Sequence, residues 1–255
     1  MGEALISRLL VKKIYAPETV LVSEPLCERR NHWQQEYGVK VTADNQETAT
    51  AEILLLAVKP QILDTIVADL STGVATKSLI ISILAGVPLA RLEGAFPENP
   101  IVRVMPNTPA TVGMGMSAIC SNSKVKPEQI DQAQEIFAAV GQVVKVSESL
   151  MDAVTGVSGS GPAYVAIMIE ALADGGVAAG LPRTIAAQLA VQTVLGTAQL
   201  VQQSGLHPAQ LKDRVTSPGG TTIAGVAQLE QAGFRSAIIK AVGAACQRSQ
   251  ELGKS

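Results

Sequence analysis

The chain has 255 residues, enough for a sizeable core in one or two domains, and its 20 Lys and Arg residues nearly balance 22 Asp and Glu residues. This balance and the 3% aromatic content argue against a nucleic-acid-binding protein, which would use a basic face and stacking side chains. The three widely separated cysteines indicate reduced thiols in a cytoplasmic protein, and the two histidines argue against a metal site or a Ser-His-Asp relay. Glu3 and Arg8 interrupt the N-terminal apolar run, which excludes a signal peptide, and no segment is expected to span a membrane.

The first ten residues have the pattern of an amphipathic helix. Leu5 and Leu9 are four residues apart and begin an apolar stripe. Glu3 would lie in the first turn, where its negative charge suits the helix dipole. We therefore expect the chain to begin in a helix rather than in a strand.

Up to about Ser147, short β-branched runs alternate with helical stretches. The runs at 53–58 and 78–84 do not alternate polar with apolar residues, which is typical of a parallel sheet covered on both faces. Residues 1–147 are therefore predicted to form an α/β domain. We expect strands over 20–23, 39–42, 53–58, 78–84, 101–105, 116–121 and 143–147, and helices over 25–36, 60–70 and 127–139.

From about Leu150 the strand-like runs stop, and helices are expected over 161–179 and 183–203. Residues 153–211 have only the three charged side chains Glu170, Asp174 and Arg183, so these helices are apolar on almost every side. Such helices must be buried, and a helical domain this short cannot cover two of them. We therefore expect residues 148–255 to form an all-α domain that pairs with an identical chain, rather than a membrane bundle.

Small or turn-forming residues follow three consecutive predicted strands. In an open parallel sheet, ligands bind at the carboxyl ends of the strands, so these residues predict a shared crevice. Ordinary strand-to-helix loops explain them equally well. The residues are Ala57, Val58, Lys59 and Pro60 after the third strand, Ala85 and Gly86 after the fourth, and Met105, Pro106 and Asn107 after the fifth.

The sequence Ser-Pro-Gly-Gly-Thr-Thr at 217–222 leads into a further helical run. Gly219 and Gly220 would allow a ligand to approach free backbone N–H groups at a helix N-terminus, and Thr221 and Thr222 add hydroxyl groups. This combination suits a small carboxylate or phosphate. An ordinary helix cap is the alternative interpretation.

Five motifs in this order closely resemble those of pyrroline-5-carboxylate reductases, and the resemblance covers essentially the whole chain. They are LLLAVKP (54–60), RVMPNTP (103–109), VTGVSGSGPAYV (154–165), DGGVAAGLPR (174–183) and VTSPGGTTIAG (215–225). The resemblance implies a Rossmann-like domain over 1–147 and a dimerisation and substrate-binding domain over 148–255. It implies reduction of (S)-1-pyrroline-5-carboxylate to L-proline with NADPH or NADH, the last step of proline biosynthesis, by a homo-oligomer, either a dimer or a ring of dimers.

Family members begin with a strand and a loop of the form G-x-G-N-M-G-E-A, and MGEALISRLL is similar to the end of that loop. Gly2 would be its third glycine. The missing strand would be the central one of the sheet, and its neighbours would have unpaired backbone groups. We therefore expect a start of translation assigned too late, and a 255-residue chain that is poorly stable in its first half and nearly inactive.

The resemblance also implies a set of site residues. The substrate carboxylate would bind to backbone amides near Gly220 and Thr221, and the Thr222 hydroxyl would face the ring nitrogen. Thr222 and Thr155 are the catalytic candidates, no single catalytic acid is assigned, and no metal is expected. The substrate-binding set is Glu148, Ser217, Gly219, Gly220, Thr221 and Thr222, and the cofactor-binding set is Gly2, Glu24, Asn45, Ala57, Val58, Lys59, Pro60, Ala85 and Asn107.

The choice of cofactor depends on residues near the end of the first predicted strand. Glu24 sits where an acidic side chain would bond to a ribose 2′-OH, which favours NADH. Arg29 and Arg30, one turn further on, would clamp a 2′-phosphate or belong to a solvated helix face. The cofactor preference that is usual in the family favours NADPH.

Two other functions are left open by the sequence. A reductase of the β-hydroxyacid dehydrogenase type would use a lysine in its helical domain, and residues 151–211 contain none. A non-catalytic helical dimer with a degenerate nucleotide domain is supported only by the absent glycine loop. The intact strand-end and Ser-Pro-Gly-Gly motifs argue against it.

Overall fold

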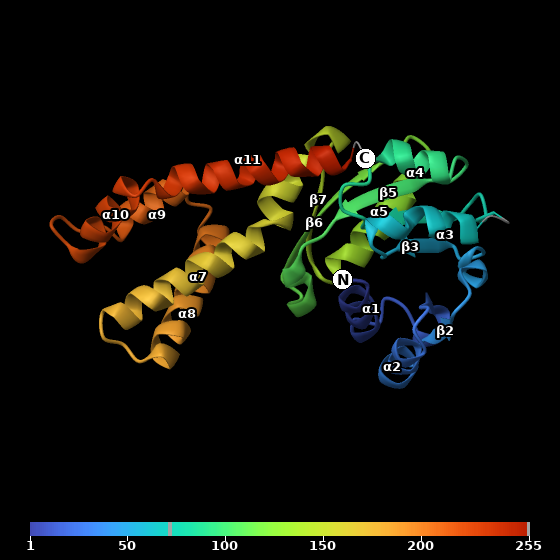
Figure 1. Cartoon of the computed structure of the whole chain (residues 1–255), viewed down its shortest axis with the longest axis horizontal. Coiled ribbons are helices and arrows are strands. Elements are labelled where there is room, and N and C mark those ends of the chain that lie inside the picture. Colours follow the sequence, from blue (N-terminus) through green and yellow to red (C-terminus); the bar gives the residue numbers. More distant parts are fainter. Residues whose placement is uncertain (71–72, 254–255) are drawn as a thin grey trace. The chain divides into compact units, whose positions relative to one another are not determined.

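Figure 1 shows the computed structural model, which describes residues 1–70 and 73–253. The chain forms two compact units. Unit 1 comprises Met1–Ser160 with Ala244–Ser255, and unit 2 comprises Gly161–Gly243. Unit 1 contains every strand that the structure describes, whereas unit 2 is helical. The expected domain boundary at 147/148 stays a prediction, because the last strand ends at Lys145 while the compact unit extends to Ser160.

The strands of unit 1 form two sheets. β1 (Leu21–Ser23) pairs in parallel with β2 (Lys40–Thr42). The second sheet has the order β3 (Ile53–Leu56), β4 (Leu79–Ser82), β5 (Ile101–Met105), β6 (Gly115–Ser121) and β7 (Gly141–Lys145). The division between the two sheets falls between β2 and β3 in the order of the chain. Each strand overlaps its predicted run.

The five-stranded sheet is parallel, as predicted, except at one pair of strands. β5 and β6 are antiparallel, with Arg103 opposite Cys120 and Val104 opposite Ile119, whereas the other strand pairs are parallel. Only residues 106–114, including the 3₁₀ turn Thr108–Val112, connect β5 to β6. A parallel crossover needs a dozen or more residues, so this short connection requires the chain to reverse.

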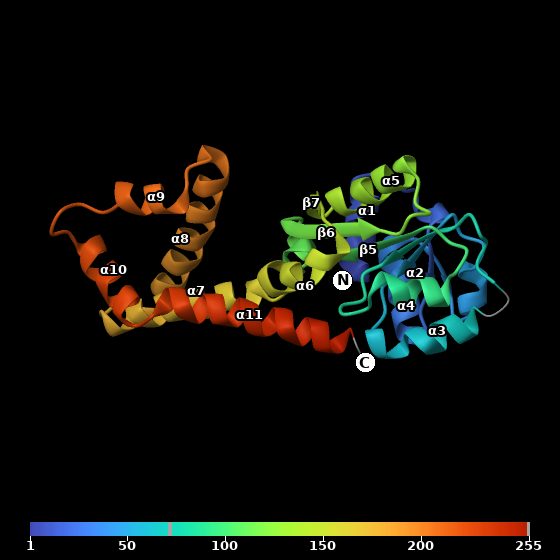
Figure 2. The same cartoon turned by 90° about the horizontal axis from the view of Figure 1, so that it is seen from above.

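Helices cover both faces of the five-stranded sheet (Figure 2). α3 (Leu63–Asp69) and α4 (Leu89–Ala95) pack on the face that contains Ile80, and α1 (Gly2–Val11) and α5 (Pro127–Ala138) pack on the face that contains Ile81. Leu5 and Leu9 of α1 are buried, which confirms the amphipathic N-terminal helix. α2 (Cys27–Tyr37) and α6 (Met151–Val154) complete the α-helices that lie entirely within unit 1. α4 was not predicted from the sequence.

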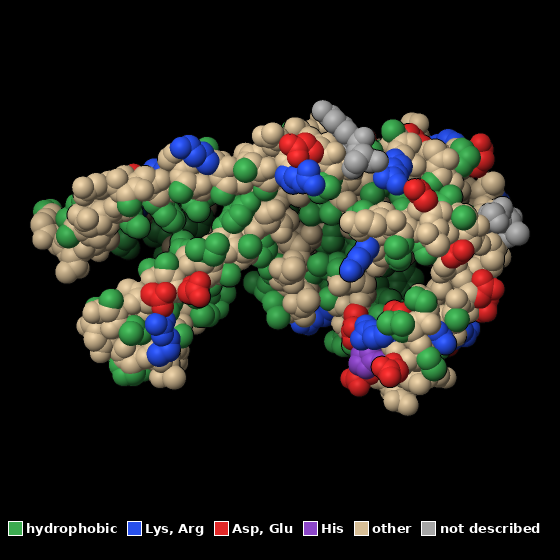
Figure 3. Space-filling view, viewed as in Figure 1, with side chains coloured by type: hydrophobic (Ala, Val, Ile, Leu, Met, Phe, Trp, Pro, Cys, Tyr) green, Lys and Arg blue, Asp and Glu red, His purple; other side chains and the backbone are tan. Residues whose placement is uncertain are grey.

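Unit 2 contains α7 (Gly161–Ala178), α8 (Arg183–Ser204), α9 (Pro208–Arg214), α10 (Thr221–Gln231) and the first part of α11 (Phe234–Leu252). α7 and α8 pack through a small core of Ala173, Ala186 and Ala190. Many larger apolar side chains on the same helices are exposed, and Figure 3 shows apolar side chains along this unit. They include Val165, Ile167, Leu172, Ile185, Leu189, Leu195 and Leu200.

α8 has the length and apolar composition that could cross a membrane, whereas the sequence analysis expected no spanning segment and favoured a paired helical domain over a membrane bundle. One such helix is weak evidence, because a helix apolar on most sides also fits a contact with another protein chain. The exposed apolar faces of α7 and α8 agree with the expectation that an identical chain covers them.

Candidate functional site

The loops after β3 and β4 leave the sheet at the same edge, because these strands are parallel. Ala57 and Lys59 are exposed after β3, and Pro60 opens a short 3₁₀ turn. Val58 packs against the apolar core, and Ala85 is exposed after β4. The exposed residues leave this edge open to a ligand. The packing of Val58 against the core holds the loop after β3 on the sheet.

Helix α1 comes close to the end of β3 at Gly2. A Cβ on Gly2 would lie 3.1 Å from the Cβ of Ala57, so the close approach of helix and strand depends on the absent side chain. No side-chain hydrogen bond caps α1 in the part of the chain that the structure describes. Its first-turn N–H groups therefore suit an anion such as a dinucleotide pyrophosphate.

A second glycine shapes the loop after β4. Gly86 has a φ of +77°, and a Cβ there would lie 3.2 Å from the Cβ of Leu252 near the end of α11. The end of α11 belongs to unit 1 and is fixed there by Ser249, whose hydroxyl donates to the Asp152 carboxylate over 2.6 Å. The C-terminal turn of α11 thus supports the loop that contains Ala85.

Asn45 and Glu24, two members of the predicted cofactor-binding set, lie near the end of β1. Asn45 accepts a hydrogen bond from the Ser23 hydroxyl (2.7 Å) and donates one to Asp69 (2.8 Å), so it connects the end of β1 to α3. The Glu24 carboxylate accepts from the backbone N–H of Leu26 over 3.1 Å. These contacts hold the loop between β1 and α2 in place.

The two arginines of α2 have different partners. Arg30 donates from Nη1 to the carbonyl oxygens of Glu24 and Pro25, each over 2.7 Å. Arg29 pairs with Glu3 of α1 over 2.6 Å. Neither arginine therefore belongs to a purely solvated helix face.

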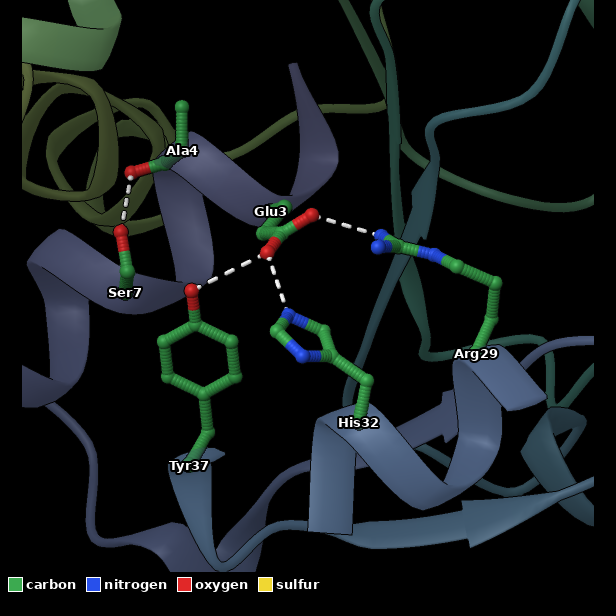
Figure 4. Close-up of polar contacts among 6 residues, drawn as sticks. All are labelled: Glu3, Ala4, Ser7, Arg29, His32 and Tyr37. Carbon is green, nitrogen blue, oxygen red and sulfur yellow. Dashed lines mark hydrogen bonds and ion pairs between the residues drawn. The ribbon is translucent and has the colours of Figure 1, made fainter. Parts of the chain in front are cut away.

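Glu3 is the centre of a polar cluster between α1 and α2 (Figure 4). One oxygen accepts from Arg29, and the other contacts His32 Nε2 (2.8 Å) and the Tyr37 hydroxyl (3.1 Å). The hydrogen bonds from Arg29 and His32 lower the pKa of Glu3 from 4.5 to about 2. The sequence analysis used Glu3 only as a residue that suits the helix dipole, and its contacts could not be read from spacing.

Glu148 is held from two sides. Its Oε1 accepts from the backbone N–H of Leu89, at the start of α4, over 2.6 Å and from Arg103 Nη1 over 3.1 Å. Only 8% of the Arg103 side chain is exposed, against 36% for Glu148. The pair thus joins β5, α4 and the 3₁₀ turn Glu148–Leu150 that precedes α6. Arg103 was quoted within a motif, but the sequence analysis gave it no role.

The segment after α6 passes close to the end of β5. Residues Thr155–Gly159 form a π-helical turn, a distortion that is frequent at functional sites. The Thr155 hydroxyl donates to the carbonyl of Met151 over 2.9 Å, and a Cβ on Gly159 would lie 2.5 Å from Cε of Met105.

Asn107 connects this segment to β6. Its Oδ1 accepts from the N–H of Met116 (2.9 Å), and its Nδ2 donates to the Ser158 hydroxyl (3.3 Å). Ser158, which the sequence analysis passed over, therefore helps to hold Thr155 and Asn107 in one part of unit 1.

The predicted substrate loop lies in unit 2. The N–H of Gly220 donates to the carbonyl of Ser217 over 3.1 Å, and Gly219 has a φ of +65°. This tight turn ends at Gly220, and α10 begins at Thr221 with no side-chain cap. The 217–222 segment therefore presents first-turn N–H groups, as predicted, and Thr222 is half-buried beside them.

The structure groups the predicted residues by unit. The cofactor set, Glu148 and Thr155 belong to unit 1, and Ser217–Thr222 belong to unit 2. Among the described residues, no cluster of His, Cys, Asp and Glu has the form of a metal site. A cavity of about 360 Å³ lies at the amino ends of β3 and β4, lined by Glu52, Lys77 and Gln129 among others, at the opposite edge from the strand-end loops.

Comparisons with known proteins agree with this organisation. Residues 148–252 match the family model described as pyrroline-5-carboxylate reductase dimerisation. Residues 1–86 match the model described as NADP oxidoreductase, coenzyme F420-dependent. The two matches fall on the helical region and on the sheet region.

Several curated relatives and several solved structures with similar chains are named pyrroline-5-carboxylate reductase. The pyrroline-5-carboxylate reductase of Synechocystis is 64% identical, over 100% of this chain and 95% of its own length. That of Escherichia coli K12 is 39% identical, over 100% and 96%. The Coxiella burnetii enzyme superposes with a TM-score of 0.92 at 33% identity, covering 100% and 95% of the two chains. The Plasmodium falciparum enzyme with NADP bound superposes with a TM-score of 0.89 at 35% identity, covering 99% and 94%.

Proposed function

The chain belongs to the pyrroline-5-carboxylate reductase family, and from that premise we propose which of its residues carry the reduction of pyrroline-5-carboxylate to proline. It is an oxidoreductase that uses NAD(P)H, and proline biosynthesis is the process that it completes. We assign the substrate site from one observation. The tight turn Ser217–Gly220 leads directly into α10.

The substrate carboxylate binds at the N-terminus of α10. An eleven-residue helix with uncapped first-turn N–H groups attracts a small anion, and the backbone of Gly219 and Gly220 lets that anion come close. The N–H groups of the first turn of α10, beginning at Thr221, hold the carboxylate, while the N–H of Gly220 closes the turn on Ser217. The Thr222 hydroxyl then faces the ring nitrogen and stabilises the amine that forms.

The cofactor binds across the N-terminus of α1 and the loops after β3, β4 and β5, and when bound it supplies the hydride. Gly2 permits the close approach of α1 to this edge, and the exposed Ala57 and Ala85 leave space for the dinucleotide. Hydride transfer to a protonated imine needs orientation and exclusion of water rather than a protein nucleophile. The residues of the chain therefore act by positioning the imine and the cofactor.

Unit 1 has two further candidates for contact with the substrate, Glu148 and Thr155. The Thr155 hydroxyl donates to Met151, and its oxygen can still accept a hydrogen bond from a protonated ring nitrogen. Glu148 is oriented by Arg103 and Leu89, so its second oxygen can contact a cationic ring. We assign Thr222 and Thr155 as the residues nearest to the chemistry.

The chain forms a homo-oligomer with a small-molecule substrate. We propose a two-fold dimer in which α7 and α8 of two copies cover each other, with rings of dimers as a higher assembly. On this proposal the apolar face of α8 contacts protein rather than lipid, and the enzyme works in the cytoplasm.

The test is oxidation of NADPH in the presence of pyrroline-5-carboxylate, followed as loss of the reduced nicotinamide band. We expect Thr222→Val to lower kcat roughly 100-fold, because a hydrogen bond to a charged group is lost, and Thr222→Ser to stay within about tenfold of wild type. Thr65→Val, at an exposed position of α3, is the control and should match wild type. Full activity of Thr222→Val would contradict the assignment.

A further inference from the structure

The charge environment of Arg29 is set by α1 rather than by its own helix. The guanidinium Nη2 lies 2.6 Å from Glu3 Oε2, and 42% of the Arg29 side chain is exposed. The guanidinium carbon lies 5.8 Å from the centre of the Trp33 ring, within the range of a cation–π contact. Arg29 is therefore a partly exposed cation with Glu3 as its counterion.

The charge of a second carboxylate also acts on Arg29. The hydrogen bond and charge of Glu3 raise the pKa of Arg29, and the charge of Glu24 adds to this effect. The Glu24 carboxylate is bonded to the N–H of Leu26, at the loop that leads into α2. Two negative groups thus act on Arg29, and Glu3 has the stronger influence.

The location of this pair connects it to the cofactor. In sheets of this type the ribose of the dinucleotide lies at the carboxyl end of the strand before α2, where an arginine accommodates a 2′-phosphate and an acidic residue bonds to a 2′-OH. Nη1 of Arg30 is bonded to the two carbonyl oxygens of its own loop. Arg29 uses one of its five N–H donors on Glu3, and its exposed side has donors left for a phosphate.

We propose that Glu3 is a specificity-determining residue for the cofactor: as the counterion of Arg29, it weakens the attraction of this guanidinium for a ribose 2′-phosphate and so lowers the preference for NADPH over NADH. The inference rests on the proposed function of this end of the sheet as the cofactor site. The 2′-phosphate is a dianion, so the fixed charge of Glu3 disfavours NADPH, whereas the neutral 2′-OH of NADH is affected little.

The test measures binding of each cofactor by calorimetry on the full chain without substrate. Glu3→Gln removes the charge and can still accept hydrogen bonds from α2. We expect the Kd for NADPH to fall roughly three- to tenfold, as one charge acting on a dianion in a high dielectric implies, while the Kd for NADH changes less than about twofold. Glu36→Gln, which removes an exposed carboxylate at the far end of α2, is the matched control and should leave the ratio unchanged.

Arg29→Met shows whether the effect passes through Arg29. This variant should weaken binding of NADPH but not of NADH, and adding Glu3→Gln to it should lower the Kd for NADPH by less than Glu3→Gln does in the wild type, because only the direct repulsion by Glu3 is then removed. Equal changes for both cofactors in Glu3→Gln, weaker binding of NADPH, or an unchanged ratio would each overturn the proposal and leave Glu3 as a contact between α1 and α2. A wild-type chain that binds neither cofactor would overturn the proposed function itself. Thermal unfolding of each variant distinguishes lost binding from lost folding.

Discussion

Removing Glu148 should destabilise the chain more than removing Arg103, although the two residues form one ion pair. The reason is the difference in exposure: the Arg103 side chain is 8% exposed and that of Glu148 is 36% exposed. Glu148→Ala leaves a buried guanidinium without its carboxylate and the N–H of Leu89 without its acceptor. Arg103→Met leaves a carboxylate that water can reach and that still accepts from Leu89.

The magnitudes follow from these contacts. Breaking a buried ion pair costs about 3–5 kcal/mol, and the partial exposure of Glu148 favours the lower end, so we expect about 3 kcal/mol for Glu148→Ala. An apolar side chain of similar volume replaces a buried charge at little cost, so we expect about 1 kcal/mol for Arg103→Met. The double variant should cost about 1.5 kcal/mol, less than Glu148→Ala alone, because no buried cation is left.

Urea unfolding at one fixed protein concentration measures all three variants, and the fixed concentration is needed because the chain forms an oligomer. The order of the free energies of unfolding of the three variants tests the reasoning. If Arg103→Met were the more destabilising single substitution, or if the double variant showed the sum of both costs, the reasoning from burial would be refuted.

Two further predictions come from the pKa shifts. The pKa of Glu3 is about 2 in the folded chain and 4.5 without its partners, so its hydrogen bonds stabilise the fold above pH 4.5 and this contribution is lost as the pH falls toward 2. After allowance for its partial exposure, Glu3→Gln should lower the free energy of unfolding by about 1–2 kcal/mol at pH 7 and by almost nothing near pH 2; an equal loss at both pH values would contradict this. Burial raises the pKa of the Cys120 thiol to about 11 despite the nearby Arg103, so a thiol reagent at pH 8 should label the exposed Cys27 quickly and Cys120 only after unfolding. Rapid labelling of Cys120 in the native chain would show that this part of the sheet opens.

Much of the fold could be predicted because local patterns dominate it. The continuous apolar runs of β3 and β4 predicted strands covered on both faces, and all four residues of β4 are buried. The spacing of Leu5 and Leu9 predicted α1 correctly. The antiparallel pairing of β5 with β6 was missed because strand direction depends on the connection, and the turn Thr108–Val112 does not appear in a strand pattern.

Some features of the candidate site could likewise be predicted from local sequence patterns, and others could not. The turn at Ser217–Gly220 was visible because glycine and a helix start are local signals. The contacts of Glu3 with Arg29 and of Arg103 with Glu148 join residues 26 and 45 positions apart, and no periodicity indicates them. Charged groups that are far apart in sequence find their partners only through tertiary packing, so the electrostatics of the site required the structure.

The central claim is that this chain transfers a hydride from NAD(P)H to the imine carbon of pyrroline-5-carboxylate. The direct test uses NADPH deuterated at the transferable position and mass spectrometry of the product. We expect proline with one deuterium at Cδ, formed in step with oxidation of the cofactor. Oxidation of the cofactor without labelled proline, or proline with deuterium at any position other than Cδ, would contradict the account.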